Sequence, residues 1–244
     1  MKKIFLVLLV LVVVISCNKS IKKQKKYPEN LSKVIEKHGG FDVWRSFKTV
    51  TFTVKNEEHT TDLNSRKALV NTDKYSLGFD GENVWLKEQD LAAFKGNPEF
   101  YYNLYFYFYA MPFVLTDDGI IYSETKAIEF EGVSYPGIKI SYKANVGTSP
   151  DDNYFIYYHP ETYQMEWLGY TVTYFSKKPS SEFNIIRYND WENVNGLVLP
   201  KSITWYKKNE EGNPLAPTRE PTKFSSALLS KAPLADSFFE KPKQ

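Results

Sequence analysis

The sequence predicts a mainly β (α+β) protein built on an antiparallel sheet or barrel. Short stretches of alternating apolar and polar residues recur at intervals of about 8 to 12 residues, and turn sequences separate them. The second observation is the high aromatic content, which is 16% of the 244 residues. Hydrophobic residues make up 42% and charged residues 25%. This balance excludes disordered, collagen-like and disulfide-scaffold proteins. It also leaves much ring surface to bury.

Residues 1–16 have the pattern of a lipoprotein signal peptide. Lys2 and Lys3 precede an unbroken apolar run from Ile4 to Ile15, which is too short to span a bilayer as a helix. The sequence Val14-Ile15-Ser16-Cys17, which holds the only cysteine, resembles a bacterial lipobox, where the thiol accepts the lipid. We therefore predict lipid attachment at Cys17 and binding to the membrane through this lipid. A secretory peptide with a chance cysteine is the alternative.

Residues 17–28 are predicted to form the lipidated cysteine and a basic tether. The stretch 18–28 holds five Lys and no acidic residue, which leaves 24 basic against 29 acidic residues in the chain after the signal peptide and tether. A mildly acidic body argues against nucleic acid as a partner. The tether also lacks an acidic run after the cysteine of the kind that resembles a surface-export signal. We therefore expect a monomer anchored in the outer membrane and facing the periplasm.

The body begins with two predicted helices. Apolar residues at helical spacing predict the first over Glu29 to Lys37, Gly39-Gly40 ends it, and a short second helix follows from Phe41 to Phe47. The period then changes to two, so that the side chains of Val50, Phe52 and Val54 share one face of a strand.

The same alternation continues along the chain. Turn dipeptides predict hairpins around Asp80-Gly81 and Asn195-Gly196. Further strands are predicted over 138–142, 154–158 and 170–174. The tail after Trp205 is predicted to be rich in turns. Leu228-Leu229 and Phe238-Phe239 are predicted to pack against the rest of the domain.

The segment 98–111 does not follow this alternation of apolar and polar residues. It places eight aromatic residues in the ten positions 100–109, with Pro98 suited to a helix start and Pro112 to its end. We predict a helix that is apolar nearly all round. Such a helix caps the concave face of the curved sheet, although the aromatic residues also suit a strand.

Catalytic signals are weak. The three histidines His38, His59 and His159 have no metal-ligand spacing, and the acidic pairs Asp117-Asp118 and Asp151-Asp152 suit turns better than calcium loops. Nucleophile elbows and phosphate or dinucleotide loops are missing from the sequence. We therefore expect no cofactor, no metal site and no catalytic residue. An envelope hydrolase that acts through two carboxylates stays as an alternative.

A set of turn and core residues resembles a known group of proteins. The residues are His38-Gly39-Gly40 with Trp44, Phe79-Asp80-Gly81 with Trp85, Met165-Glu166-Trp167, and Asp190-Trp191 followed by Gly196-Leu197 and Pro200. Over residues 30–205 the chain resembles uncharacterised Bacteroidetes-type envelope lipoproteins, which are similar to the periplasmic lipoprotein carrier and receptor fold (LolA/LolB-like). The resemblance implies a single LolA/LolB-like domain over 29–244, in which a strongly curved antiparallel sheet forms an incomplete β-barrel with the N-terminal helix and the aromatic helix capping its concave face. It further implies a hydrophobic cavity on the concave face that binds acyl chains or a lipoprotein.

Two functions remain open from the sequence. The first is a membrane-anchored envelope lipoprotein that binds lipid acyl chains or a lipoprotein without catalysis. The second is a structural or sensory interaction module with a fully packed core that binds a protein partner. Strand parity and helical spacing assign the cavity and its lid in the first function to Phe52, Val54, Trp85, Tyr101, Tyr105, Phe108 and Tyr109.

Overall fold

A computed structural model describes residues 27–117, 119–143 and 151–243 of the chain. The predicted signal peptide and Cys17 lie outside these residues. Within them, thirteen strands form one antiparallel sheet. They are β1 (Thr49–Val54), β2 (Glu57–Asp62), β3 (Ala68–Asn71), β4 (Tyr75–Phe79), β5 (Val84–Glu88), β6 (Ile120–Phe130), β7 (Val133–Tyr142), β8 (Tyr154–Tyr158), β9 (Met165–Tyr170), β10 (Asn184–Val194), β11 (Leu197–Lys208), β12 (Pro214–Pro217) and β13 (Thr222–Ser230).

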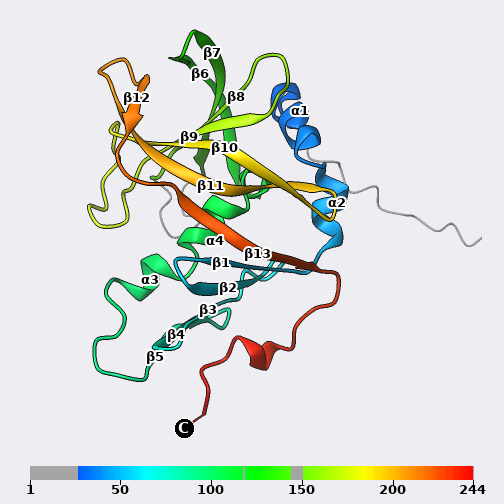
Figure 1. Cartoon of the computed structure of the whole chain (residues 1–244), viewed down its shortest axis with the longest axis vertical. Helices are drawn as coiled ribbons and strands as arrows, with labels where there is room; N and C mark the ends of the chain where they lie inside the picture. Colours follow the sequence, from blue (N-terminus) through cyan, green and yellow to red (C-terminus); the bar gives the residue numbers. More distant parts are fainter. Residues whose placement is uncertain (1–26, 118, 144–150, 244) are drawn as a thin grey trace, which may run out of the picture.

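The sheet is open and curved, which confirms the predicted fold class. Its strands follow the order β5-β4-β3-β2-β1-β13-β11-β10-β9-β8-β7-β6, and β12 pairs with β11 beside this path. In the described part of the chain the two end strands, β5 and β6, do not pair with each other, so the barrel is incomplete. Figure 1 shows β1–β5 and β6–β11 as two parts of the sheet, with helix α4 between them.

Strand β13 corrects the expectation for the C-terminal tail. Residues 222–230 form a strand that pairs with β1, where Val50 lies opposite Leu229, and with β11, where Ser202 lies opposite Lys223. The tail thus joins the two parts of the sheet (Figure 1). Of the two pairs expected to dock, Leu229 and Phe239 are buried, whereas their neighbours Leu228 and Phe238 are exposed.

The N-terminal helices match the prediction closely. Helix α1 spans Glu29–Lys37 and α2 spans Phe41–Ser46. Gly39, between them, has a φ of 109°, and a Cβ at this position would collide with the carbonyl oxygen of Gly196. A glycine is therefore required here both for the turn and for the close approach of the β10–β11 hairpin.

The aromatic segment forms two short helices where one was predicted. Helix α3 spans Pro98–Tyr101, with the side chain of Asn97 accepting a hydrogen bond from the backbone N–H of Phe100, and α4 spans Leu104–Tyr109. Asn103 separates them with a φ of −120°, outside the helical range. Asparagine is a poor helix former because its amide competes for backbone groups. A 3₁₀ turn, η1 (Phe113–Thr116), follows α4, and a second, η2 (Asp236–Phe238), lies in the tail.

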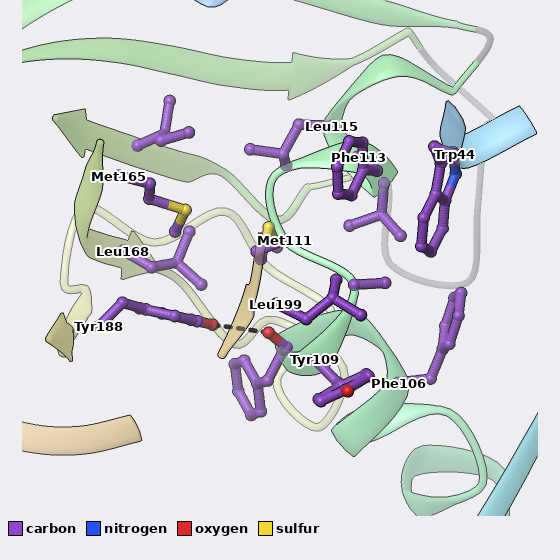
Figure 2. Close-up of a cluster of buried hydrophobic side chains, with 14 of the residues drawn as sticks. Trp44, Phe106, Tyr109, Met111, Phe113, Leu115, Met165, Leu168, Tyr188 and Leu199 are labelled. Atoms are coloured by element: carbon purple, nitrogen blue, oxygen red, sulfur yellow. Dashed lines mark hydrogen bonds between the residues drawn. The ribbon is translucent and has the colours of Figure 1, made fainter. Parts of the chain in front are cut away.

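Helix α4 fills the concave side of the sheet. Tyr109 is fully buried and stacks on Phe52 of β1 with ring centroids 4.2 Å apart. On the sheet side, the hydroxyl of Tyr188 donates a hydrogen bond to the carbonyl oxygen of Phe108 (Figure 2). A further stack joins Trp44 of α2 to Phe113, with centroids 4.6 Å apart. These contacts form one large core, so the interior behind α4 is packed with side chains.

A second, smaller core contains other residues of the β6–β11 part. It holds Ile128, Tyr135, Tyr157, Trp167 and Ile185. Because side chains alternate between the two faces of a strand, Tyr157 and its neighbour Ile156 belong to different cores. No helix of the described residues is long and apolar enough to cross a membrane.

Candidate functional site

A pocket of about 140 Å³ lies between helices α3 and α4 and one end of strands β7, β8 and β9. Aromatic rings dominate its lining. They come from Phe100, Tyr107, Phe108, Tyr142, Tyr154, Tyr170 and Tyr174. An engineered apolar cavity of about 150 Å³ holds one benzene molecule. The pocket therefore accommodates a chemical group of that size, and a complete acyl chain needs more room.

The tyrosine hydroxyls of the pocket are neutral hydrogen-bonding groups. Burial raises the pKa of Tyr107, Tyr142, Tyr154 and Tyr170 above the ordinary value of 10. The hydroxyl of Tyr170 also accepts a hydrogen bond of 2.8 Å from the indole N–H of Trp205. Because a phenol both donates and accepts, these groups orient a ligand without adding charge.

Two carboxyl groups line the same pocket. Glu99 is exposed at the start of α3, whereas Asp152 is half-buried before β8. Asp152 accepts hydrogen bonds from the backbone N–H of Thr173 at 2.6 Å and from the hydroxyl of Thr171 at 3.3 Å. Burial raises the pKa of Asp152, and these hydrogen bonds act in the opposite direction. The loop after β9 thereby fixes the carboxyl group in place.

Of the seven residues assigned to a cavity and lid, only Phe108 lines this pocket. Phe52, Val54, Tyr105 and Tyr109 are buried in the large core, on the concave side behind the pocket. Trp85 lies on β5, where its indole N–H donates a hydrogen bond of 2.8 Å to the carbonyl oxygen of Phe239. The assignment of these residues to ligand binding stays a prediction, and binding at the four core residues requires α4 to move.

Tyr101 takes part in a polar network that holds α3 against β2. Its hydroxyl lies 2.8 and 3.0 Å from the two carboxylate oxygens of Glu57. Glu57 also accepts hydrogen bonds from the hydroxyl of Tyr75 at 2.7 Å and from Nε2 of the buried His59 at 3.1 Å. Burial raises the pKa of Glu57, but these hydrogen bonds outweigh it and the pKa is lowered. We call Glu57, His59, Tyr75 and Tyr101 the α3 latch.

Removing the charge of the latch should free α3. We expect Glu57→Gln to lower the free energy of unfolding by about 2 kcal/mol, because hydrogen bonds to a charged group contribute about 1.5–3 kcal/mol. Denaturant unfolding measures this loss. Glu58→Gln, at the exposed neighbouring position, is the matched control and should change the stability little. Equal stability of the two variants would show that the latch does not hold α3.

The sequence held a signal for some pocket residues. Tyr142 continues the alternation of Ile138 and Ile140, so strand parity places its ring on the inner face. The strand predicted over 170–174 was wrong, because β9 ends at Tyr170 and the backbone N–H groups of Thr171 and Thr173 bond to Asn153 and Asp152. Asp152 could not be identified as a pocket residue from the sequence, since acidic pairs are common in polar turns. Among the described residues, no group of three or more His, Cys, Asp or Glu side chains stands in an arrangement that could hold a metal ion.

Comparison with known proteins identifies a family and a group of similar structures. A family described as "Family of unknown function (DUF6503)" matches residues 85–213, just over half of the chain. None of the curated proteins matches the chain. Structural neighbours include a LolA superfamily protein from Nitrosomonas europaea, with 10% sequence identity and a TM-score of 0.41 over 85% of this chain and 96% of that one.

Two other neighbours have similar values. A putative outer membrane lipoprotein-sorting protein domain from Vibrio parahaemolyticus has 7% identity and a TM-score of 0.44, over 86% of this chain and 94% of that one. A DUF1329 family protein from Desulfovibrio piger has 8% identity and a TM-score of 0.44, over 86% and 95%. The neighbours thus include the LolA group that the sequence resemblance names.

Proposed function

The chain belongs to the DUF6503 family of unknown function, and we propose that it is a non-catalytic envelope lipoprotein that binds an acyl chain of a lipid or lipoprotein. In this proposal the chain is anchored through Cys17 in the outer membrane, faces the periplasm, and carries one binding domain over 29–244. The hydrophobic run before Cys17 and the basic tether after it support the anchor.

The observation that carries the binding proposal is the ring-lined pocket at the edge of α3 and α4. Aromatic side chains lining a concave site with a few polar groups are typical of sites for small apolar ligands. The pocket lies beside the buried rings of Phe108 and Tyr105, which occupy the concave side of the sheet. An acyl chain that starts in the pocket continues into this space when α3 and α4 move outward.

The lid in this proposal consists of α3 and α4. Both helices are short, and the α3 latch rests on one carboxylate, Glu57. Movement of the lid costs the apolar contacts of α4, and burial of the acyl chain offsets this cost at about 25 cal/mol per Å². The acyl chain must therefore be long enough to replace the apolar contacts that the rings of α4 lose when the lid moves.

The second candidate is an interaction module with a packed core. The close packing of Phe52, Tyr109 and their neighbours favours it, as does the small volume of the pocket. A module of this kind binds a protein partner and takes up no lipid. The two candidates therefore differ in one measurable property, which is the uptake of an acyl chain.

Binding of a neutral probe, a fluorescent long-chain alcohol, to the full chain tests the proposal. We expect saturable binding, and native mass spectrometry should show one bound molecule. Leu104→Asp places a charge in the half-buried lining of the pocket and should weaken binding at least about tenfold, because a bound acyl chain would bury this charge without a partner. Leu91→Asp, at a fully exposed leucine outside the pocket, is the control. No binding would favour the packed module, and equal binding by both variants would show that the acyl chain does not lie in the pocket.

A further inference from the structure

We propose that the pocket selects ligands that carry an organic cation, an amine or quaternary ammonium group. This inference deepens the proposed function, since it names the head group of the amphiphile whose acyl chain the concave side takes up. It rests on three features of the lining: ring faces, acidic groups and a volume that suits a small cation.

The first feature is the arrangement of rings from several elements around one space. Phe108 from α4, Tyr154 from β8 and Tyr170 from β9 line the pocket together. The face of an aromatic ring attracts a cation, and cages of such rings bind quaternary ammonium groups. The chain itself gives an example, because the Nζ atom of Lys177 lies 4.0 Å from the ring centroid of Tyr174, another lining residue.

The second feature is the sign of the charge. Glu99 and Asp152 are both acidic, and in the described part of the chain no Lys or Arg lines the pocket. Hydrogen bonds from the hydroxyl of Thr171 and the backbone N–H of Thr173 hold the Asp152 carboxyl group at the wall of the pocket. A phosphate or carboxylate head would meet these two acids with no cationic partner. An ammonium group compensates the charge of Asp152. It also lowers the pKa of this carboxyl group, which burial raises.

The third feature is size. The pocket volume of about 140 Å³ is close to the volume that holds benzene, and a trimethylammonium group is of similar size. The head therefore fits the pocket. The acyl tail fits only when α3 and α4 move, so head and tail occupy different parts of the site.

Amphiphiles with one tail and different heads test the inference on the full chain. The probes are dodecyltrimethylammonium, dodecanol and dodecyl sulfate below their micellar concentrations, with choline as a head without a tail, and calorimetry gives the affinities. We expect the cationic probe to bind at least about tenfold more tightly than dodecanol, and dodecyl sulfate to bind most weakly.

The outcomes separate the inference from the proposed function. Equal binding of the cationic probe and dodecanol would overturn the cation site and leave acyl binding in place. Binding of choline without any gain from the tail would support the cation site as one for free amines and overturn acyl binding. Binding of neither choline nor any amphiphile would overturn both.

A matched pair of variants tests the role of the carboxylate. Asp152→Asn keeps an oxygen that accepts the hydrogen bonds from Thr173 and Thr171 but removes the charge. We expect the affinity for dodecyltrimethylammonium to fall about tenfold further than the affinity for dodecanol. Asp151→Asn removes the charge of the adjacent exposed residue and should leave both affinities within about twofold. Equal losses of affinity for dodecyltrimethylammonium in the two variants would show that only the long-range charge matters, and this result would overturn the site.

Discussion

Between pH 6.5 and pH 4 we expect the free energy of unfolding to fall by about 3 kcal/mol through His38 alone. His38 is fully buried between α1 and the β10–β11 hairpin. Its Nδ1–H donates to the carbonyl oxygen of Val198 at 2.9 Å, and its Nε2 accepts from the backbone N–H of Met165 at 3.2 Å and the side chain of Gln164 at 2.9 Å. Two donors that point at Nε2 leave no room for a second proton on the ring.

Burial lowers the pKa of His38 from its ordinary value of 6.5 to about 4. The unfolded chain therefore binds a proton at this ring between pH 6.5 and pH 4, whereas the folded chain does not. Protonation then favours the unfolded state, so this contribution to stability is complete above pH 6.5. It is lost as the pH falls through the folded value near 4.

Denaturant unfolding of His38→Gln over the same pH range checks this expectation. The variant loses the ring contact with Trp191, whose centroid lies 4.4 Å away, so it should be less stable than the wild type at pH 7. As the pH falls to 4, the difference between the two proteins should shrink by about 3 kcal/mol. His159→Gln, at a half-buried histidine, is the control. Parallel stability curves for wild type and His38→Gln would contradict the assignment.

Local patterns were enough to predict much of this fold. Asp80-Gly81 and Asn195-Gly196 set tight turns, and the structure has hairpins at both positions. Gly39-Gly40 ends the first helix because the backbone there has positive φ. These features depend on a few neighbouring residues, so the sequence of each segment contains the information that determines it.

Features that depend on distant residues were harder to predict. The prolines of the tail suggested turns, yet Thr222–Ser230 becomes a central strand because β1 and β11 both offer it unpaired edges. Strand parity correctly placed Phe52 on an inner face, but it could not tell whether α4 or a ligand covers that face. The pocket arises where strand ends meet the lid, and this meeting point follows from the assembled sheet.

Tyr109 offers the strongest test of whether the concave side is a binding space. Its ring lies between Phe52 and Phe224, with centroids 4.2 and 5.1 Å away, and no hydrogen-bond partner is found for its buried hydroxyl among the described residues. Removing a buried aromatic side chain costs about 3–5 kcal/mol, so Tyr109→Ala should be destabilised by that amount. Tyr109→Phe should instead gain about 1 kcal/mol, because it removes an unpaired hydroxyl. Denaturant unfolding measures both changes.

The same variant separates the two candidate functions. Tyr109→Ala leaves an apolar cavity beneath α4, and an apolar cavity of this kind binds apolar ligands. If the acyl chain occupies this space, the variant should bind the fluorescent long-chain alcohol more tightly than the wild type although it is less stable. Tyr157→Ala, at a buried tyrosine of the second core, should lose stability without any gain in affinity. A packed interaction module would show the loss of stability in both variants and binding of the alcohol in neither, because the cavity left by one side chain is too small for a complete acyl chain.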